Sequence, residues 1–129
     1  MTKNKLYLLD TQVLLWWLSD NKRLTPKIKK IIHNPNNLIL YSTASIWEIS
    51  IKRNIGKLTL KVSLKKLINS IPFQVLPIKN QHILKLDKLP AIHKDPFDRI
   101  LIAQAKTEKA VLITADAKIS KYKLPTLYP

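Results

Sequence analysis

The sequence predicts an α/β fold in which a central parallel sheet carries helices on both faces. Short apolar runs of strand length alternate along the chain with segments of helical spacing, which is the pattern of strand–helix–strand units. Two of the apolar runs are followed within two residues by an aspartate, Asp10 and Asp116. With 129 residues and no repeat, low-complexity tract or Pro/Gly-rich linker, the chain is expected to form one domain with a single core.

The first half of the chain contains five expected elements. Pro26 suits the first turn of a helix, and Gly56 suits the position just beyond a helix end. In chain order we expect a strand over residues 5–9, helices over residues 11–18 and 26–34, a strand over residues 38–41 and a helix over residues 44–53.

The second half continues the alternation. Ser63 is placed to cap a helix, Pro77 weakens the end of a strand, and the pair Asp95-Pro96 is a strong helix start. The expected elements are a helix to residue 70, a strand over 73–78, helices over 80–86 and from 95 to about 109, a strand over 110–114 and a short edge strand over 125–128. Because ligands bind beyond the carboxyl ends of parallel strands, Asp10 and Asp116 are placed where a site is expected.

The composition narrows the classes of function. Lys and Arg number 23 against eight Asp and Glu, a net charge of +15, which points to a polyanionic partner, most plausibly a nucleic acid. The absence of cysteine excludes disulfide scaffolds and thiol nucleophiles and fits a reducing cytosol, and the single glycine excludes glycine-rich phosphate-binding loops. Apolar runs are far shorter than the roughly 20 residues of a membrane-spanning helix. We therefore expect a soluble, cytoplasmic protein.

Four carboxylates are candidates for chemistry: Asp10, Glu48, Asp98 and Asp116. Asp98 falls on the helix face that is expected to meet the core. Carboxylates that converge in one cleft repel each other, and they either take up protons or recruit a hard cation such as Mg²⁺ or Mn²⁺. Such a metal polarises a phosphoryl oxygen and lowers the pKa of a bound water. An acidic pocket in a basic protein is therefore suited to cutting a phosphodiester.

Each acid also has a purely structural explanation. Asp10 and Asp95 are placed to cap the helices that follow them, and Asp116 suits a turn or cap. Glu48 is placed to pair with Lys52 one helical turn later. Because a carboxylate beside an apolar helix face is costly unless paired or coordinated, Glu48 is the hardest of these acids to explain by structure alone.

Four segments match a known family in order along nearly the whole chain. They are residues 8–11 (LLDT), 45–49 (SIWEI), 93–99 (HKDPFDR, running into LIAQA) and 112–116 (LITAD). In these segments the chain resembles the PIN-domain ribonucleases, in particular the VapC-type toxins of bacterial toxin–antitoxin pairs. The His-x-Asp-Pro-Phe-Asp-Arg run is the most specific piece.

The resemblance implies a single PIN domain over residues 1–129 with Mg²⁺- or Mn²⁺-dependent endoribonuclease activity. The family's catalytic, metal-binding acids fall on Asp10, Glu48, Asp98 and Asp116, which would hold the water that attacks the RNA phosphodiester. Asp95 would be a peripheral ligand or only a helix cap. The resemblance also implies a homodimer and a cognate antitoxin that blocks the active site.

Other polar side chains are expected around the acids. The hydroxyls of Thr11 and Thr114 suit the orientation of water or metal ligands, and for Thr11 a cap role is equally suitable. His93 is expected to be structural or peripheral. The basic residues that flank the acids in sequence are candidates for RNA phosphate contacts: Lys52, Arg53, Lys94, Arg99 and Lys118.

Aromatic residues leave two interpretations open. Trp16, Trp17 and Trp47 lie within helical apolar patterns, which favours a place in the core or in a dimer interface over stacking on RNA bases.

Two other classes of function compete with a ribonuclease. A phosphoryl-transfer α/β domain, such as a phosphate receiver or an aspartyl-phosphate phosphatase, needs further acids near the first strand, and the run Asp10-Thr11-Gln12 argues against it. A non-catalytic basic RNA-binding module, in which the acids are only caps, would bind RNA without metal and would not cut it.

Overall fold

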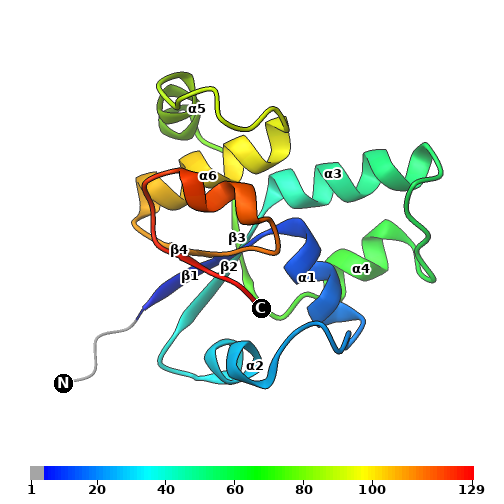
Figure 1. Cartoon of the computed structure of the whole chain (residues 1–129). Coiled ribbons are helices and arrows are strands. Elements are labelled where there is room, and N and C mark those ends of the chain that lie inside the picture. The colour runs from blue at the N-terminus through cyan, green and yellow to red at the C-terminus, as the bar shows by residue number, and fades with distance from the viewer. Residues whose placement is uncertain (1–4) are drawn as a thin grey trace.

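The computed structural model describes residues 5–129, in which five strands form one parallel sheet (Figure 1). The strand order is β3-β2-β1-β4-β5, and Leu8 of the central strand pairs with Leu40 on one side and Leu112 on the other. The strands are β1 (Leu6–Leu9), β2 (Leu38–Ser42), β3 (Gln74–Leu76), β4 (Val111–Ile113) and β5 (Thr126–Leu127). The parallel sheet that the sequence predicts is confirmed.

Each expected helix is present, and its ends lie within one residue of the expected ones. The helices are α1 (Thr11–Leu18), α2 (Pro26–His33), α3 (Thr43–Asn54), α4 (Leu64–Ser70), α5 (Asn80–Asp87) and α6 (Pro96–Glu108). A short 3₁₀ segment, η1 (Ala117–Lys121), was not predicted and follows Asp116 directly. Gly56 adopts φ +77°, which is unfavourable for other residues, and its N–H donates to the carbonyl of Arg53, so that it ends α3 as expected.

Helices cover both faces of the sheet, because alternate residues of each apolar strand enter different cores. Leu8 and Leu112 pack with α6, whereas Tyr7 and Leu9 pack with residues of α1 and α2. Figure 1 shows α5 and α6 on one side of the sheet, with α1 and α2 on the other. The expectation of helices on both faces is confirmed, and it explains why the strands are continuously apolar.

Side-chain caps determine where most helices begin. In each case an oxygen of the residue before the helix accepts a backbone N–H of the first turn. The capping residues are Asp10 for α1, Thr25 for α2, Ser42 for α3, Ser63 for α4, Asp95 for α6 and Asp116 for η1. Three of the candidate acids therefore do serve as caps.

The change in strand order falls beside β1. The chain leaves β1 towards β2, whereas it leaves β4 in the opposite direction, towards β5. Asp10 follows β1 and Asp116 comes three residues after β4, and the N–H of Asp10 donates to the carbonyl of Ile113 at 2.9 Å. The two aspartates therefore lie at the edge of the sheet where α/β folds bind ligands.

The tryptophans differ in their surroundings. Trp16 and Trp17 are partly buried against the core on the α1 and α2 side. The expectation of a core position is wrong for Trp47, whose side chain is 61% exposed and contacts the ring of Phe97 edge-on. Residue 47 lies on the side of α3 that turns away from the sheet, whereas its neighbour Glu48 turns inwards. The dimer-interface interpretation of Trp47 stays a prediction.

In residues 5–129 no helix is both long enough and apolar enough to cross a membrane.

Candidate active site

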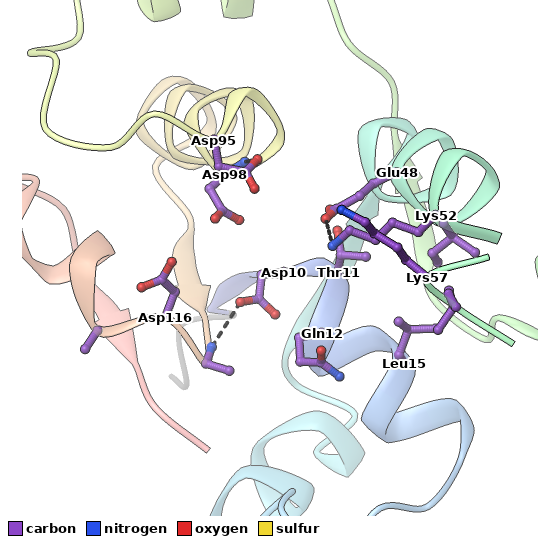
Figure 2. A pocket seen from close by; sticks show the side chains of 14 residues that line it. Asp10, Thr11, Gln12, Leu15, Glu48, Lys52, Lys57, Asp95, Asp98 and Asp116 are labelled. Atoms are coloured by element: carbon purple, nitrogen blue, oxygen red, sulfur yellow. Dashed lines mark hydrogen bonds and ion pairs between the residues drawn. The ribbon is translucent and has the colours of Figure 1, made fainter. Parts of the chain in front are cut away.

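Five of the chain's eight acids line one cavity of about 440 Å³ at the carboxyl edge of the sheet. They come from four separate parts of the chain: the end of β1, the middle of α3, the start of α6 and the loop after β4. Figure 2 shows the carboxylates of Asp10, Asp98 and Asp116 facing a common space, with Glu48 on its other side. The fold thus brings together all four acids that the sequence singles out, with Asp95 beside them.

Asp10 is held by hydrogen bonds to both of its carboxylate oxygens. Oδ1 accepts the N–H of Val13 at 2.7 Å, and Oδ2 accepts the N–H of Ala115 at 3.0 Å. Burial raises the pKa of Asp10, and hydrogen bonds with the Thr114 hydroxyl and these two N–H groups counteract part of the rise. Each oxygen keeps a second lone pair, so the cap and a ligand role are compatible.

Glu48 lies on the buried face of α3, with 5% of its surface exposed. Its Oε2 accepts a hydrogen bond from Nζ of Lys52 at 2.6 Å. The purely structural explanation of Glu48 predicted this pair. Its Oε1 is buried and has no hydrogen-bond partner among residues 5–129. The hydrogen bond to Glu48 raises the pKa of Lys52. The salt bridge therefore provides a partner for only one of the two carboxylate oxygens of Glu48.

Asp98 lies in the first turn of α6, where burial and the charge of Asp95 raise its pKa to about 7. The carboxylates of Asp10 and Glu48 add to this rise. Asp95 caps α6 through Oδ1, which accepts the N–H of Phe97 at 2.8 Å and that of Asp98 at 3.2 Å. The cap role of Asp95 is thus present in the structure, and its role as a peripheral ligand stays a prediction.

Asp116 is close to His93, at the far side of the cavity from Glu48. Nε2 of His93 lies 2.8 Å from Oδ2 of Asp116 and 3.1 Å from Oδ2 of Asp98. Partial burial acts to raise the pKa of Asp116, but the hydrogen bond with His93 and the N–H of Lys118 outweigh it and hold the pKa below its usual value. The contact between Asp116 and His93 was not predicted. The position of His93, two residues before Asp95, was the one feature of the sequence that could have indicated a place near the acids.

The two threonines expected near the acids are buried at the site. The hydroxyl of Thr11 donates to Oγ of Ser45 at 2.9 Å and ties α1 to α3. The hydroxyl of Thr114 accepts the N–H of Asp116 at 3.0 Å. Both side chains fix the elements that carry the acids, while an orienting role towards water or metal stays a prediction.

The residues of the cavity fit a hard divalent cation. The converging ligands are carboxylate oxygens, which Mg²⁺ and Mn²⁺ prefer. Oε1 of Glu48 is an acceptor that is buried, unpaired and costly in that state. Burial and the neighbouring carboxylates of Asp95, Asp10 and Glu48 raise the pKa of Asp98, and a bound cation would offset both effects. Asp10, Glu48, Asp98 and Asp116 are therefore the residues that could hold such an ion.

The basic residues are only partly where the sequence suggests. Lys52 lines the cavity together with Lys57, which was not among the expected phosphate contacts. The chain turns at Gly56 and places Lys57 beside the end of α3, where the N–H of Lys57 donates to the carbonyl of Lys52 at 2.8 Å. Arg99 instead donates from Nη1 to the carbonyl of Pro90 at 2.9 Å. The remaining expected contacts do not line the cavity; they are Arg53, Lys94 and Lys118.

A second cavity, of about 710 Å³, adjoins the acidic one and shares Gln12, Leu15 and Leu58 with it. It lies between α1 and the segment that leads into α4, and in the described part of the chain its lining residues include no carboxylate. The chemistry that acids support is therefore confined to the first cavity.

Comparison with known proteins gives one family. The family model "PIN domain" matches residues 7–124. No match was found among curated proteins.

Solved structures share the fold over nearly the whole chain. A chain of VapBC2 from Rickettsia felis, bound to a DNA fragment from its promoter, has a TM-score of 0.73 at 14% identity and covers 95% of this chain and 98% of its own. A chain of VapBC-1 from nontypeable Haemophilus influenzae has a TM-score of 0.66 at 21% identity, with 95% and 97% covered. A toxin–antitoxin complex from Klebsiella pneumoniae gives 0.65 at 18% identity, with 94% and 95% covered.

The family match spans most of the chain, and it includes every acid of the cavity. The protein belongs to the PIN domain family.

Proposed function

We propose that this protein is a Mg²⁺- or Mn²⁺-dependent endoribonuclease and the toxin of a toxin–antitoxin pair. The observation that carries the proposal is the acidic cavity: four carboxylates from distant parts of the chain converge there, and Oε1 of Glu48 is buried without a partner. Burying this much like charge is unfavourable unless a cation compensates it, so the arrangement is explained by a function rather than by stability.

The chain's own residues have distinct tasks in this proposal. A bound Mg²⁺ or Mn²⁺ would supply polarisation of a phosphoryl oxygen and a water of lowered pKa. The N–H groups of Val13 and Ala115 hold both oxygens of Asp10, so its carboxylate is oriented before any substrate arrives. Lys52 and Lys57 line the cavity, where their ammonium groups can bind the phosphates of the substrate; Lys52 can do so because its Nζ has three donor positions and Glu48 uses one of them.

RNA is the proposed substrate because the motifs that carry the acids resemble those of the PIN-domain ribonucleases, and the chain's mostly lysine charge suits a phosphate backbone. Lysine neutralises a phosphate backbone without the planar geometry by which arginine recognises guanine. The remaining flanking cations, Arg53, Lys94 and Lys118, are proposed to contact more distant phosphates. Arg99 is a weaker candidate, because its Nη1 is engaged with the carbonyl of Pro90.

A cognate antitoxin is the proposed protein partner. The similar solved structures are described as VapBC and toxin–antitoxin complexes. We extend this partner to the present chain, together with a homodimer, a cytoplasmic location and a single PIN domain over residues 1–129. Copurification of a neighbouring gene product and light scattering of the purified protein test the two assemblies.

The decisive experiment is RNA cleavage by the purified protein with Mg²⁺ or Mn²⁺. We expect Asp10→Asn and Asp98→Asn to cut about 100-fold more slowly or worse, since each loses a ligand worth several kcal/mol of transition-state stabilisation. The matched control is Asp87→Asn, which removes an exposed carboxylate at the end of α5 and should cut like the wild type. Equal rates for all three variants would refute the assignment.

The rival RNA-binding module has one observation in its favour, namely that Asp10, Asp95 and Asp116 all make the hydrogen bonds of caps. Calorimetry with Mn²⁺ on the wild type and on Glu48→Gln separates the two. The proposed nuclease requires clear Mn²⁺ binding that Glu48→Gln weakens, whereas the module predicts the same weak binding by both. A phosphoryl-transfer domain would instead be labelled by a small phosphodonor.

A further inference from the structure

We propose that His93 is a positioning residue of the acidic cavity, which holds Asp98 and Asp116 together by placing its Nε2–H between their carboxylates. The inference rests on the proposed function in one respect, namely that these acids bind a divalent cation. His93 itself does not line the cavity. It would act on a bound cation only through Asp98 and Asp116, which do line the cavity.

The hydrogen bonds of the imidazole determine where its proton lies. Nδ1 of His93 accepts the backbone N–H of Asp95 at 3.1 Å, so this nitrogen carries a lone pair and no proton. The ring proton is therefore on Nε2. That nitrogen lies 2.8 Å from Oδ2 of Asp116 and 3.1 Å from Oδ2 of Asp98. The N–H donates a hydrogen bond to Asp116 and lies in close electrostatic contact with Asp98.

The same contact excludes the simplest alternative, in which His93 is itself a metal ligand. One ligand atom each of His93, Asp98 and Asp116 lies within 4.8 Å of the others, close enough for a metal. A metal on Nε2 requires the neutral imidazole to carry its proton on Nδ1. That proton would point at the N–H of Asp95, so that two donors would face each other. The backbone at Asp95 therefore selects the tautomer that donates to the acids.

Two acids from different elements need such a group. Asp98 belongs to α6, and Asp116 lies in the loop between β4 and η1, so no backbone hydrogen bond within one element fixes their spacing. Their like charges repel each other. An N–H between the two oxygens reduces that repulsion and sets the distance between the carboxylates before a cation arrives.

The loop that carries His93 is anchored without the imidazole. The hydroxyl of Tyr122 accepts the N–H of His93 at 2.8 Å and donates to the carbonyl of Pro90 at 3.1 Å. Arg99 donates from Nη1 to the same carbonyl. These bonds hold the backbone of the loop independently of the imidazole, so a change of the His93 side chain removes only the contacts of its two ring nitrogens, that of Nδ1 with the N–H of Asp95 included. Its effect on cation binding should thus be separable from an effect on folding.

The first test is calorimetry of Mn²⁺ binding to the full-length protein. We expect His93→Leu to weaken Mn²⁺ affinity about 10- to 100-fold, as is typical when the partner of a metal ligand is lost. His93→Gln, whose side-chain amide can donate from a similar position, should recover most of the affinity. His33→Leu is the matched control, because His33 is exposed and contacts Trp17. A leucine variant that melts like the wild type and binds Mn²⁺ equally well would overturn the proposal.

The second test observes the tautomer directly and needs no activity. Long-range ¹H–¹⁵N spectra of histidine-labelled protein, with the His93 signals assigned by their absence in His93→Gln, should show a protonated Nε2 and a bare Nδ1 both before and after Mg²⁺ is added. Loss of the Nε2 proton on addition of Mg²⁺ would make His93 a ligand and overturn the proposal. If the wild type binds no Mn²⁺ at all, the proposed function fails, while the tautomer result still decides whether Nε2 carries the proton that faces the two acids.

Discussion

Two effects disfavour the charged form of Asp98, its own burial and the negative charge of the acids around it. Together these raise its pKa to about 7. Asp10 is raised in the same direction by burial. In the absence of metal the cavity therefore holds protons that the unfolded chain would already have released, which links stability to pH.

The sign of this linkage gives a prediction for the metal-free protein. Between pH about 4 and about 7 the folded state binds more protons at Asp98 than the unfolded state does, so this residue makes stability fall as pH rises. The lowered pKa of Asp116 acts in the opposite sense, but at pH below about 4. We expect the Tm of the protein in EDTA to decline across this window, and Asp98→Asn to make the decline shallower. Parallel melting curves for the two proteins at every pH would contradict this.

Cap and ligand roles were alternatives at the level of sequence, but the structure makes the two roles compatible in single residues. Asp10 caps α1 through Oδ1 and still faces the cavity. Glu48 pairs with Lys52 through one oxygen and leaves the other free. A carboxylate has more acceptor positions than a cap or a salt bridge uses, so an observed structural role does not argue against a functional one.

Among the elements, α5 and α6 are joined by a buried polar contact. His82 of α5 is fully buried, its Nδ1 accepts the N–H of Lys79 at 3.0 Å, and its Nε2 donates to Oε2 of Glu108 at 2.8 Å. Glu108 is one of only three acids outside the cavity, and the sequence suggests no more than a surface position for it.

We predict that Glu108→Ala lowers the free energy of unfolding by about 1–3 kcal/mol, because a buried N–H of His82 loses its acceptor. Glu108→Gln keeps an acceptor oxygen and should lose less. Urea unfolding of the three proteins measures the difference, and RNA cleavage should be unchanged, since the contact lies outside the cavity. An alanine variant as stable as the wild type would show that solvent replaces the carboxylate.

The end of α6 offers a prediction in the opposite direction. Lys109 follows this helix with φ +57°, the left-handed conformation that glycine adopts freely and other residues adopt at a cost. Lys109→Gly should therefore raise the free energy of unfolding by about 1 kcal/mol. Lys106→Gly, inside the same helix, is the control and should lower it by about 1 kcal/mol.

Helices were located more reliably than irregular segments because their starts are local. Ser63 and Asp95 cap helices through atoms two or three residues away, so sequence suffices to find them. The 3₁₀ segment after Asp116 is only five residues long and has no apolar periodicity that would reveal it. The strand expected over residues 73–78 shrinks to Gln74–Leu76, because Pro77 has no N–H to donate to the sheet.

At the scale of the whole molecule, opposite charges are separated. The chain has a net charge of +15, yet five of its eight acids line one cavity. This separation suits a protein that binds a polyanion over its surface and a cation at one point. It predicts that substrate binding depends on ionic strength far more than metal binding does.

For single-stranded RNA, a contact with about five phosphates gives a slope of about −3.5 in log affinity against log salt, so a fourfold rise in salt should weaken binding about 100-fold. Fluorescence anisotropy with the Asp10→Asn variant measures this without cleavage. Replacement of Lys52 and Lys57 by Met should reduce the slope by about 1.4. A slope near zero would show that the positive charge of the chain does not contact RNA.

The sequence by itself determined the order and type of nearly every element and the identity of the candidate acids, because caps, apolar periodicity and motif spacing act over a few residues. Only the tertiary structure decided which groups meet across the chain. It brought Asp10, Glu48, Asp98 and Asp116 into one cavity, turned Arg99 towards the loop at Pro90, and placed His93 between two carboxylates. These contacts join residues up to 106 positions apart and depend on how β1, α3, α6 and β4 pack, which no local pattern encodes.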